Sequence, residues 1–263
     1  MKLANSFARL SYGPDPNQFG RLRLPPTPGP HPVAIVIHGG MWHAMYGLDY
    51  MDKLSQSLTA TGIATLNIEY RRVGNAGGGW PGTFLDVSAA IAHLTALSST
   101  YLLDLGHVIV IGHSSGGHLA LCAAGHQNLP ADHPFYAPLP FSLRAVVAIS
   151  PVTDLRRALE IMPDSDIIAQ LVGGTPEQMP ARFAAASPIE LLPLRVRQII
   201  IHGTGDDLVP FQMSAEYHAA ALAAGDSAVL VPLPRSGHFE PIDPQADVWP
   251  QVIGNIQSAL LTQ

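Results

Sequence analysis

A serine stands between a strand-like run and a helix-like run near the middle of the sequence. The segment at residues 108–120 reads VIVIGHSSGGHLA, in which Gly112, Ser114 and Gly116 fit the pattern G-x-S-x-G. Small residues at these positions let a strand turn sharply into a helix, so that the serine hydroxyl is exposed at the turn. The spacing predicts that Ser114 is a nucleophile, and the alternative is a Gly-rich turn whose serine merely caps the helix.

Residues that could activate this serine come later in the chain. A serine hydroxyl is a poor nucleophile at neutral pH unless a base takes its proton and an acid orients that base. His238 lies in the motif SGHF, and Asp206 and Asp207 lie in the motif HGTGDDLVP. Each motif follows a strand-like run. We expect His238 to be the base, and the residues alone leave open which aspartate orients it.

The sequence HGGMW at residues 38–42 follows another strand-like run. Attack of a nucleophile on a carbonyl group needs N–H donors for the developing oxyanion, and glycine lets the backbone approach closely. We expect the amides of Gly39 and Gly40 to be such donors, together with the amide of Ser115, the residue after the nucleophile. The alternative for HGG is a tight turn at a strand end.

Two tryptophans also follow strand-like runs, Trp42 in HGGMW and Trp80 after three glycines in GGGW. The glycine run lacks the GK[ST] of a phosphate-binding loop and the spacing of a dinucleotide fingerprint, so we interpret it as a flexible rim loop. We expect Trp42 and Trp80 to line the substrate pocket. The alternative is that both belong to the core.

Other residues that could do chemistry indicate packing instead. Among the 12 histidines, His93, His126 and His218 are expected at the surface or in packing, and His202, at a strand end, does not suit the role of base. Paired histidines with a nearby carboxylate on one helix are missing from the sequence, so neither a metal site nor a cofactor is predicted. The single cysteine, Cys122, is predicted to be a small buried core residue.

The elements that must position these residues are short apolar runs that alternate with helix-like segments. The alternation predicts a mainly parallel sheet with helices on both faces and an edge hairpin in the first thirty residues. Ligands bind beyond the carboxyl ends of such strands, which is where the candidate residues lie. The strand-like runs after the first thirty residues are at 33–40, 63–70, 108–112, 143–150, 196–203 and 228–234.

Length and composition suit one domain over residues 1–263, because 47% of the residues are hydrophobic and 13% are charged. Residues 151–195 interrupt the rhythm of the strands with roughly 45 residues rich in Pro, Met and Ala, which is longer than an ordinary connection. Because long loops are often lids or binding elements, we predict that this insertion is a small cap or lid over the site.

The charge and the apolar pattern restrict the partners. A net charge of −6 without a long run of either sign argues against a broad basic face for nucleic acid or anionic lipid. The N-terminal sequence lacks the apolar stretch of a signal peptide, and no apolar run approaches the length of a membrane span. We therefore expect a cytoplasmic protein with a small-molecule partner and no membrane, and we leave a homodimer open.

Taken together, HGGMW, GHSSGGHLA, HGTGDDLVP and SGHF resemble the α/β-hydrolase superfamily of serine hydrolases. Within it, HGGxW and GHSxGxH are similar to the kynurenine formamidase (arylformamidase) branch and its carboxylesterase relatives, which often have Ala where Ser115 and Gly117 stand. The resemblance implies an α/β-hydrolase fold with an eight-stranded sheet and Ser114 at its elbow. The family pattern HGxxDxxVP implies that Asp206 is the acid, with Asp207 as the fallback.

The function that this resemblance implies is hydrolysis of a small carboxylic ester or an aryl formamide through an acyl-enzyme. Ser114, Asp206 and His238 would then act together as nucleophile, acid and base. Two alternatives remain open at the level of the sequence. One is a serine peptidase-like hydrolase, because peptidase relatives share HGTxDD, and the other is a non-catalytic hydrolase-fold protein that binds a ligand.

Overall fold

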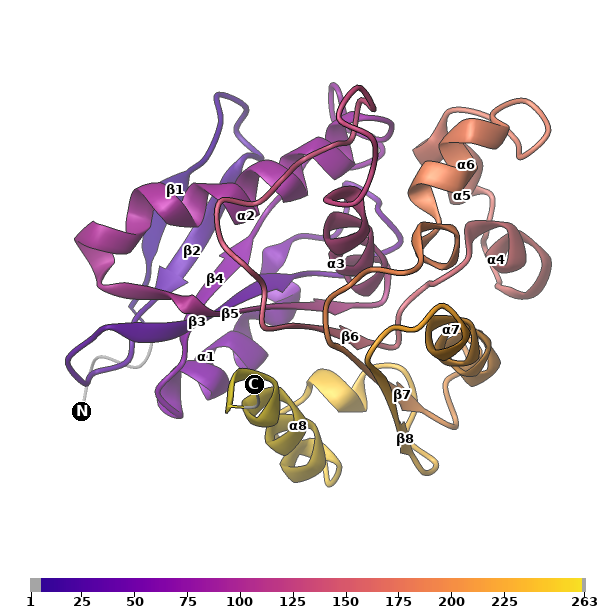
Figure 1. The fold of residues 1–263 in the computed structure, drawn as a ribbon. Coiled ribbons are helices and arrows are strands. Elements are labelled where there is room, and N and C mark those ends of the chain that lie inside the picture. Colours follow the sequence, from indigo (N-terminus) through magenta and orange to yellow (C-terminus); the bar gives the residue numbers. More distant parts are fainter. Residues whose placement is uncertain (1–5, 262–263) are drawn as a thin grey trace.

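A computed structural model describes residues 6–261 of the chain. Its strands are β1 (Ala8–Ser11), β2 (Phe19–Arg23), β3 (His31–Ile37), β4 (Ala64–Ile68), β5 (Leu103–His113), β6 (Ala145–Ile149), β7 (Gln198–Gly203) and β8 (Ala228–Leu233). They form one sheet in the order β1-β2-β4-β3-β5-β6-β7-β8 (Figure 1). Residues 1–5, which begin the N-terminal segment in which no signal peptide is expected, lie outside the described range.

The sheet is parallel from β4 to β8, and β1 and β2 form an antiparallel hairpin at its edge. Strands β4 and β6 are buried along their whole length, as expected where helices cover both faces of a parallel sheet. Strand β8 at the opposite edge has both buried and exposed positions. The predicted eight-stranded, mainly parallel sheet and its edge hairpin are confirmed.

Helices pack on both faces of the sheet (Figure 1). Side chains of β3 alternate between the two faces of the sheet. Val33 and Ile35 belong to the core that α2 and α3 cover, and Ala34 and Val36 belong to the core that α1 and α8 cover. The helical elements are η1 (Leu48–Met51), α1 (Asp52–Ala60), α2 (Gly82–Tyr101), α3 (Ser115–His126), α4 (Leu155–Ile161), α5 (Ile167–Val172), α6 (Pro180–Ala186), η2 (Pro188–Leu191), α7 (Phe211–Ala223), η3 (Glu240–Ile242) and α8 (Trp249–Leu261).

The insertion at 151–195 folds as α4, α5, α6 and η2 between β6 and β7, beside α3 in Figure 1. Two buried histidines of α3 fasten it: Nε2 of His118 donates to the carbonyl oxygen of Ala186 at 2.6 Å, and Nε2 of His126 donates to that of Ala185 at 3.0 Å. The insertion is thus bound to the helix that follows Ser114. Its role as a cap or lid stays a prediction.

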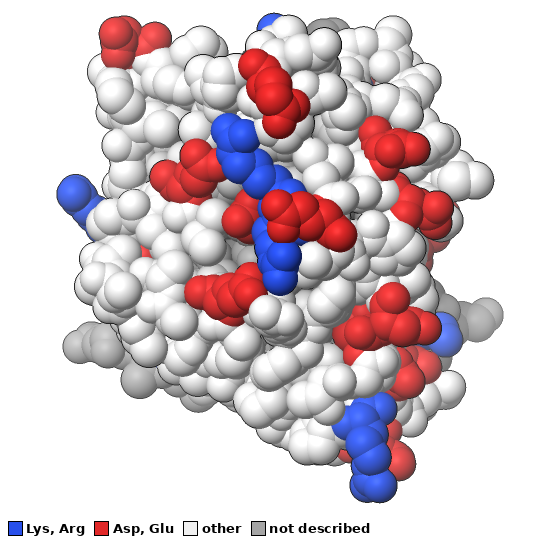
Figure 2. Space-filling model, turned by 90° about the vertical axis from the view of Figure 1, so that its right-hand side faces the viewer, with Lys and Arg blue, Asp and Glu red and all other residues white. Residues whose placement is uncertain are grey.

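Ion pairs also tie the first helix of the insertion to its surroundings. Arg156 pairs with Glu190 of η2 at 3.3 Å, and Arg157 pairs with Glu216 of α7 at 3.7 Å. Figure 2 shows this side of the molecule, where the Lys and Arg side chains in its middle are bordered by Asp and Glu. The charges on this face are therefore mixed in sign.

The single cysteine and the helices agree with the apolar pattern of the sequence. Cys122 lies inside α3 with 1% of its surface exposed, which confirms that it is a buried core residue. Across residues 6–261, none of the helices is both long enough and apolar enough to cross a bilayer.

Candidate active site

The turn at Ser114 has the strand and the helix that its sequence predicts. Strand β5 ends at His113 and α3 begins at Ser115, which leaves Ser114 alone at the turn with φ 56° and ψ −124°. A residue with a side chain rarely adopts a positive φ, and such strain is typical of functional sites. A Cβ at Gly116 would overlap the carbonyl oxygen of Ile37, so glycine is what lets α3 begin this close to β3.

His238 and Asp206 meet beyond the ends of β8 and β7. Nδ1 of His238 donates to Oδ2 of Asp206 at 2.7 Å, and the carboxylate side chain is completely buried. Asp207, the other candidate, is exposed on the same loop. The structure therefore brings Asp206, and not Asp207, onto the imidazole of His238.

The carboxylate of Asp206 is held in its charged form. Burial alone would raise its pKa, but hydrogen bonds from His202 and His238 and from the amide of Val209 outweigh burial and hold that pKa well below its ordinary range. Oδ1 accepts the amides of Leu208 and Val209 at 3.0 and 2.9 Å. Asp206 is thus a fixed negative charge beside His238.

His202 contributes to this arrangement in a way that the sequence did not reveal. It is fully buried, with Nε2 at 3.2 Å from Oδ2 of Asp206 and 2.9 Å from the carbonyl oxygen of Val209. Because that carbonyl can only accept, Nε2 carries the hydrogen, and Nδ1 accepts from the hydroxyl of Ser214 at 2.6 Å. The signal available in the sequence was its position four residues before Asp206 at the end of a buried strand.

The residue before the serine links the turn to the loop of His238. Nε2 of His113 donates to the main-chain oxygen of His238 at 2.8 Å, and the two rings are 4.6 Å apart between centroids. On the other side of the turn, the amide of Ser114 donates to the carbonyl oxygen of Ile149 at 2.8 Å. Ser114 and His238 therefore lie in neighbouring loops joined through His113.

The HGG loop lies against the turn at Ser114. A Cβ at Gly39 would be 3.1 Å from the Cβ of Ser114, which shows how closely the two backbones approach. Gly40, Met41 and Trp42 have φ values of 107°, 52° and 54°, so the loop reverses through three successive left-handed residues.

A side chain of α3 holds this loop in place. The amide of Trp42 donates to Oγ of Ser115 at 3.3 Å. Ser115 is also the first residue of α3, where backbone amides have no acceptor within the helix and the helix dipole favours negative charge. The arrangement puts the amide of Ser115 and the glycine loop side by side.

The structure corrects the expectation that Trp42 lines the pocket. Its side chain has no exposed surface, and its indole Nε1 donates to Nδ1 of His118 at 3.1 Å inside the core. Trp80 is half-buried, with its ring 4.2 Å from that of Phe135 and the guanidinium of Arg182, from the insertion, 5.4 Å above it. A substrate contact by Trp80 stays a prediction.

Exposed aromatic side chains lie at the site instead. Phe239 is 51% exposed, and its ring meets that of His238 edge-on at 5.1 Å. Tyr46 is 44% exposed and covers Gly40, where a Cβ would overlap it. Phe239 directly follows His238 and Tyr46 lies six positions after Gly40, so both contacts are local in the sequence. The motifs do not specify that these two rings are exposed, and the sequence therefore did not single them out.

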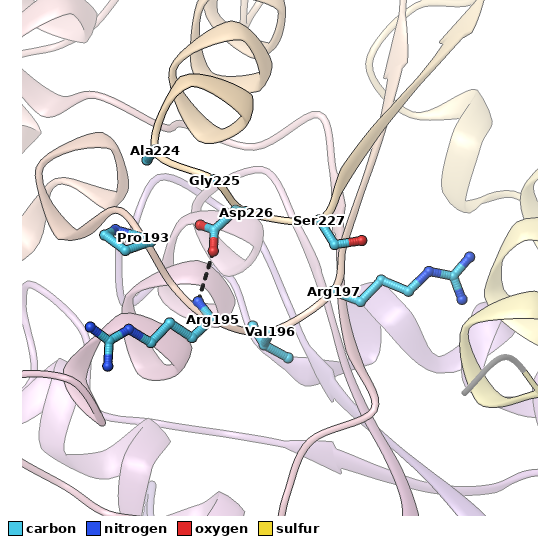
Figure 3. A pocket seen from close by; sticks show the side chains of 8 residues that line it. All are labelled: Pro193, Arg195, Val196, Arg197, Ala224, Gly225, Asp226 and Ser227. Carbon is cyan, nitrogen blue, oxygen red and sulfur yellow. Dashed lines mark hydrogen bonds between the residues drawn. The ribbon is translucent and has the colours of Figure 1, made fainter.

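A separate cavity of about 440 Å³ lies at the other end of β7, among residues 193–197 and 224–227 (Figure 3). The carboxylate of Asp226 fills its middle and accepts the amides of Leu194 and Arg195 at 2.6 and 2.9 Å. The side chains of Arg195 and Arg197 point away from it in opposite directions (Figure 3). This cavity is at the amino-terminal end of the strand, away from Asp206 and His238.

The strand order, the serine turn and the loops beyond β7 and β8 define an α/β-hydrolase fold. The chain belongs to the BD-FAE family, whose model matches residues 22–221. The fold class and the superfamily that the sequence motifs indicated are confirmed.

Two curated relatives come from Mycobacterium tuberculosis. Esterase LipQ is 28% identical over 213 residues, which cover 79% of this chain and 50% of LipQ. The probable carboxylic ester hydrolase LipM is 27% identical over 190 residues, which cover 71% of this chain and 44% of LipM. The chain thus spans about half the length of these two relatives.

Solved structures resemble the chain in fold. A truncated form of a carbohydrate esterase from gut microbiota superposes with a TM-score of 0.82 at 23% identity, covering 98% of both chains. Esterase B from Lactobacillus rhamnosis (HN001) has a TM-score of 0.82 at 23% identity, covering 97% of this chain and 84% of the other.

Proposed function

We propose that this chain is a serine-dependent hydrolase of small carboxylic esters. The observation that carries the proposal is the 2.7 Å hydrogen bond from Nδ1 of His238 to the buried carboxylate of Asp206. The side chain of His113, the residue before Ser114, bonds to the main chain of His238 and so links the two loops. The printed names of LipQ and LipM, an esterase and a probable carboxylic ester hydrolase, support an ester as the substrate. An aryl formamide is the second substrate class, favoured by the motifs HGGMW and GHSSGGH.

His238 has the tautomer that a base needs. A carboxylate can only accept, so the proton between His238 and Asp206 lies on Nδ1, which leaves Nε2 as the nitrogen that can take a proton. In this mechanism Nε2 takes the proton of the Ser114 hydroxyl as Oγ attacks the substrate carbonyl. The negative charge of Asp206 then stabilises the imidazolium that forms.

The loop and the helix start supply the donors for the oxyanion. When Oγ of Ser114 attacks, negative charge develops on the carbonyl oxygen, and preorganised amides stabilise it. The amides of Gly39, Gly40 and Ser115 fill this role in the proposal. His238 then gives its proton to the leaving oxygen, the alcohol departs, and water hydrolyses the acyl-enzyme with His238 again acting as base.

The position of Phe239 suggests which part of the substrate it contacts. Because His238 protonates the leaving group, the leaving group lies on the side of this imidazole. Phe239 presents a half-exposed ring at 5.1 Å from that imidazole, so it offers an apolar face to the alcohol part of the ester. Phe239 thereby replaces Trp42 as the proposed substrate contact.

The test is labelling together with a substrate panel. The purified chain is treated with a fluorophosphonate and the labelled residue is located by mass spectrometry. In parallel, kcat/KM is measured on p-nitrophenyl acetate, p-nitrophenyl butyrate, N-formylkynurenine and a peptide. We expect label on Ser114 and turnover of the esters.

The other outcomes separate the alternatives. A chain that neither takes the label nor cleaves any substrate would be a ligand-binding protein with this fold. A labelled chain that cleaves only the formamide, or only the peptide, would contradict the ester as substrate.

A further inference from the structure

His113 connects the nucleophile turn with the loop that carries His238. It is completely buried, so it has no surface to offer a substrate. Its Nε2 lies 2.8 Å from the main-chain oxygen of His238, a residue 125 positions later in the chain. The contact is therefore a tertiary link that ends on the backbone of the proposed base.

The tautomer of His113 follows from its two partners. The carbonyl oxygen of His238 can only accept, so Nε2 carries a hydrogen. Burial lowers the pKa of His113 to about 3, and the ring is consequently neutral near neutral pH. Nδ1 then has a lone pair, and the hydroxyl of Tyr50, 2.9 Å away, donates to it. Tyr50 keeps its hydrogen because burial raises its pKa above the ordinary value.

Two hydrogen bonds hold His238, one to its side chain and one to its main chain. Its Nδ1 is fixed by Asp206, beyond β7, and its main chain is fixed by His113, at the end of β5. We propose that His113, whose Nδ1 accepts from Tyr50, is a positioning residue that holds His238 at the hydroxyl of Ser114. The inference rests on the proposed roles of Ser114 and His238.

The rate of the proposed reaction depends on where His238 lies relative to Ser114. A displacement of about 1 Å in a catalytic group can lower the rate about 10²-fold. Without the donor at His113, the main chain of His238 loses its bond to the Ser114 turn while Asp206 still holds the ring. The expected consequence is a lower kcat with little change in KM, because the lost interaction matters in the transition state and not in substrate binding.

The variants separate positioning from packing. His113→Gln keeps an amide N–H near the place of Nε2, whereas His113→Leu fills a similar volume without a donor. The matched control is His126→Leu, because His126 is also buried and also donates from Nε2 to a main-chain oxygen, that of Ala185. Tyr50→Phe removes a single hydroxyl and leaves the aromatic ring in place.

The experiment measures kcat per active site, with sites counted by fluorophosphonate titration, together with KM for p-nitrophenyl butyrate and the thermal midpoint. His113→Leu should lower kcat per site about 10²-fold, and His113→Gln should recover most of the loss. Tyr50→Phe should lower kcat about fivefold, because a buried acceptor is left unpaired. His126→Leu should lower the thermal midpoint and leave kcat per site unchanged.

Two results would overturn the inference. One is an unchanged kcat per titrated site in His113→Leu, and the other is an equal loss in the Gln and Leu variants. If His113→Leu does not fold, an unchanged kcat in Tyr50→Phe overturns it as well. A wild-type chain that takes no label and hydrolyses no ester would instead refute the proposed function, which is a distinguishable outcome.

Discussion

Nδ1 of His238 and Oδ2 of Asp206 lie 2.7 Å apart, although the two residues belong to loops that follow different strands. The carboxylate of Asp206 has no exposed surface. Nε2 of His202 lies 3.2 Å from the same oxygen. This relationship distinguishes two adjacent aspartates that the residue pattern alone left equivalent.

Replacement of Asp206 by Asn should lower kcat about 10⁴-fold, because an amide donates where the carboxylate accepts and so favours the wrong tautomer of His238. The matched control is Asp207→Asn, one position away and exposed, which should leave kcat near the wild-type value. Steady-state kinetics on p-nitrophenyl acetate measure both. A larger loss in the Asp207 variant would reverse the assignment of the acid.

Replacement of Phe239 by Ala should raise KM for phenyl butyrate about fivefold, since an aromatic contact with the leaving group is worth about 1 kcal/mol. KM for ethyl butyrate, which has the same acyl group and no ring in its alcohol, should change less. Leu222→Ala is the control, because Leu222 is 52% exposed on α7. Equal changes in KM for the two esters would show that Phe239 does not contact the leaving group.

Replacement of Trp42 by Phe should affect stability and not substrate binding. The variant loses the indole N–H and leaves Nδ1 of His118 without its donor inside the core, at a cost of about 1–3 kcal/mol in the free energy of unfolding. Urea denaturation measures this cost, and KM is measured beside it. A raised KM with unchanged stability would return Trp42 to the substrate pocket.

Acid should destabilise the protein through three buried histidines. Burial lowers the pKa values of His113 and His118 to about 3 and that of His126 to about 4, from 6.5. As the pH falls below about 6.5, the unfolded chain binds protons that the folded chain does not, so the free energy of unfolding falls by about 1.4 kcal/mol per pH unit for each histidine. This loss continues until the pH reaches the folded-state pKa values.

The measurement is urea denaturation between about pH 6 and about pH 5, where carboxylates of the unfolded chain are still mostly ionised. His126→Gln keeps a side-chain donor but cannot titrate, so its slope should be smaller than that of the wild type by about 1.4 kcal/mol per pH unit. Identical slopes for the wild type and the variant would show that His126 does not remain neutral in the folded state.

The sequence predicted the sheet and the serine turn because both depend on local patterns. Runs of β-branched residues between glycines specify buried parallel strands, and the small residues around Ser114 specify a sharp turn from β5 into α3. The choice of Asp206 over Asp207 came from the family pattern and not from any local rule. Its contact with His238 is now seen in the structure.

The features that the sequence did not reveal depend on contacts between distant parts of the chain. His113 bonds to a residue 125 positions away, and Trp42 turns inward because His118, 76 positions later, accepts its indole N–H. The local sequence around a tryptophan that follows a strand does not differ between one that faces the core and one that faces a pocket. The direction of its ring is settled by tertiary packing, which composition and periodicity do not encode.

The central claim is that Ser114 attacks the ester carbonyl. The most direct measurement is kcat of the purified chain and of Ser114→Ala on p-nitrophenyl acetate. The thermal midpoints of both proteins are compared to show that the variant is folded. The account predicts a loss of about 10⁶-fold in kcat for the variant, as for other hydrolases that lose their serine nucleophile. Activity retained in Ser114→Ala would contradict it.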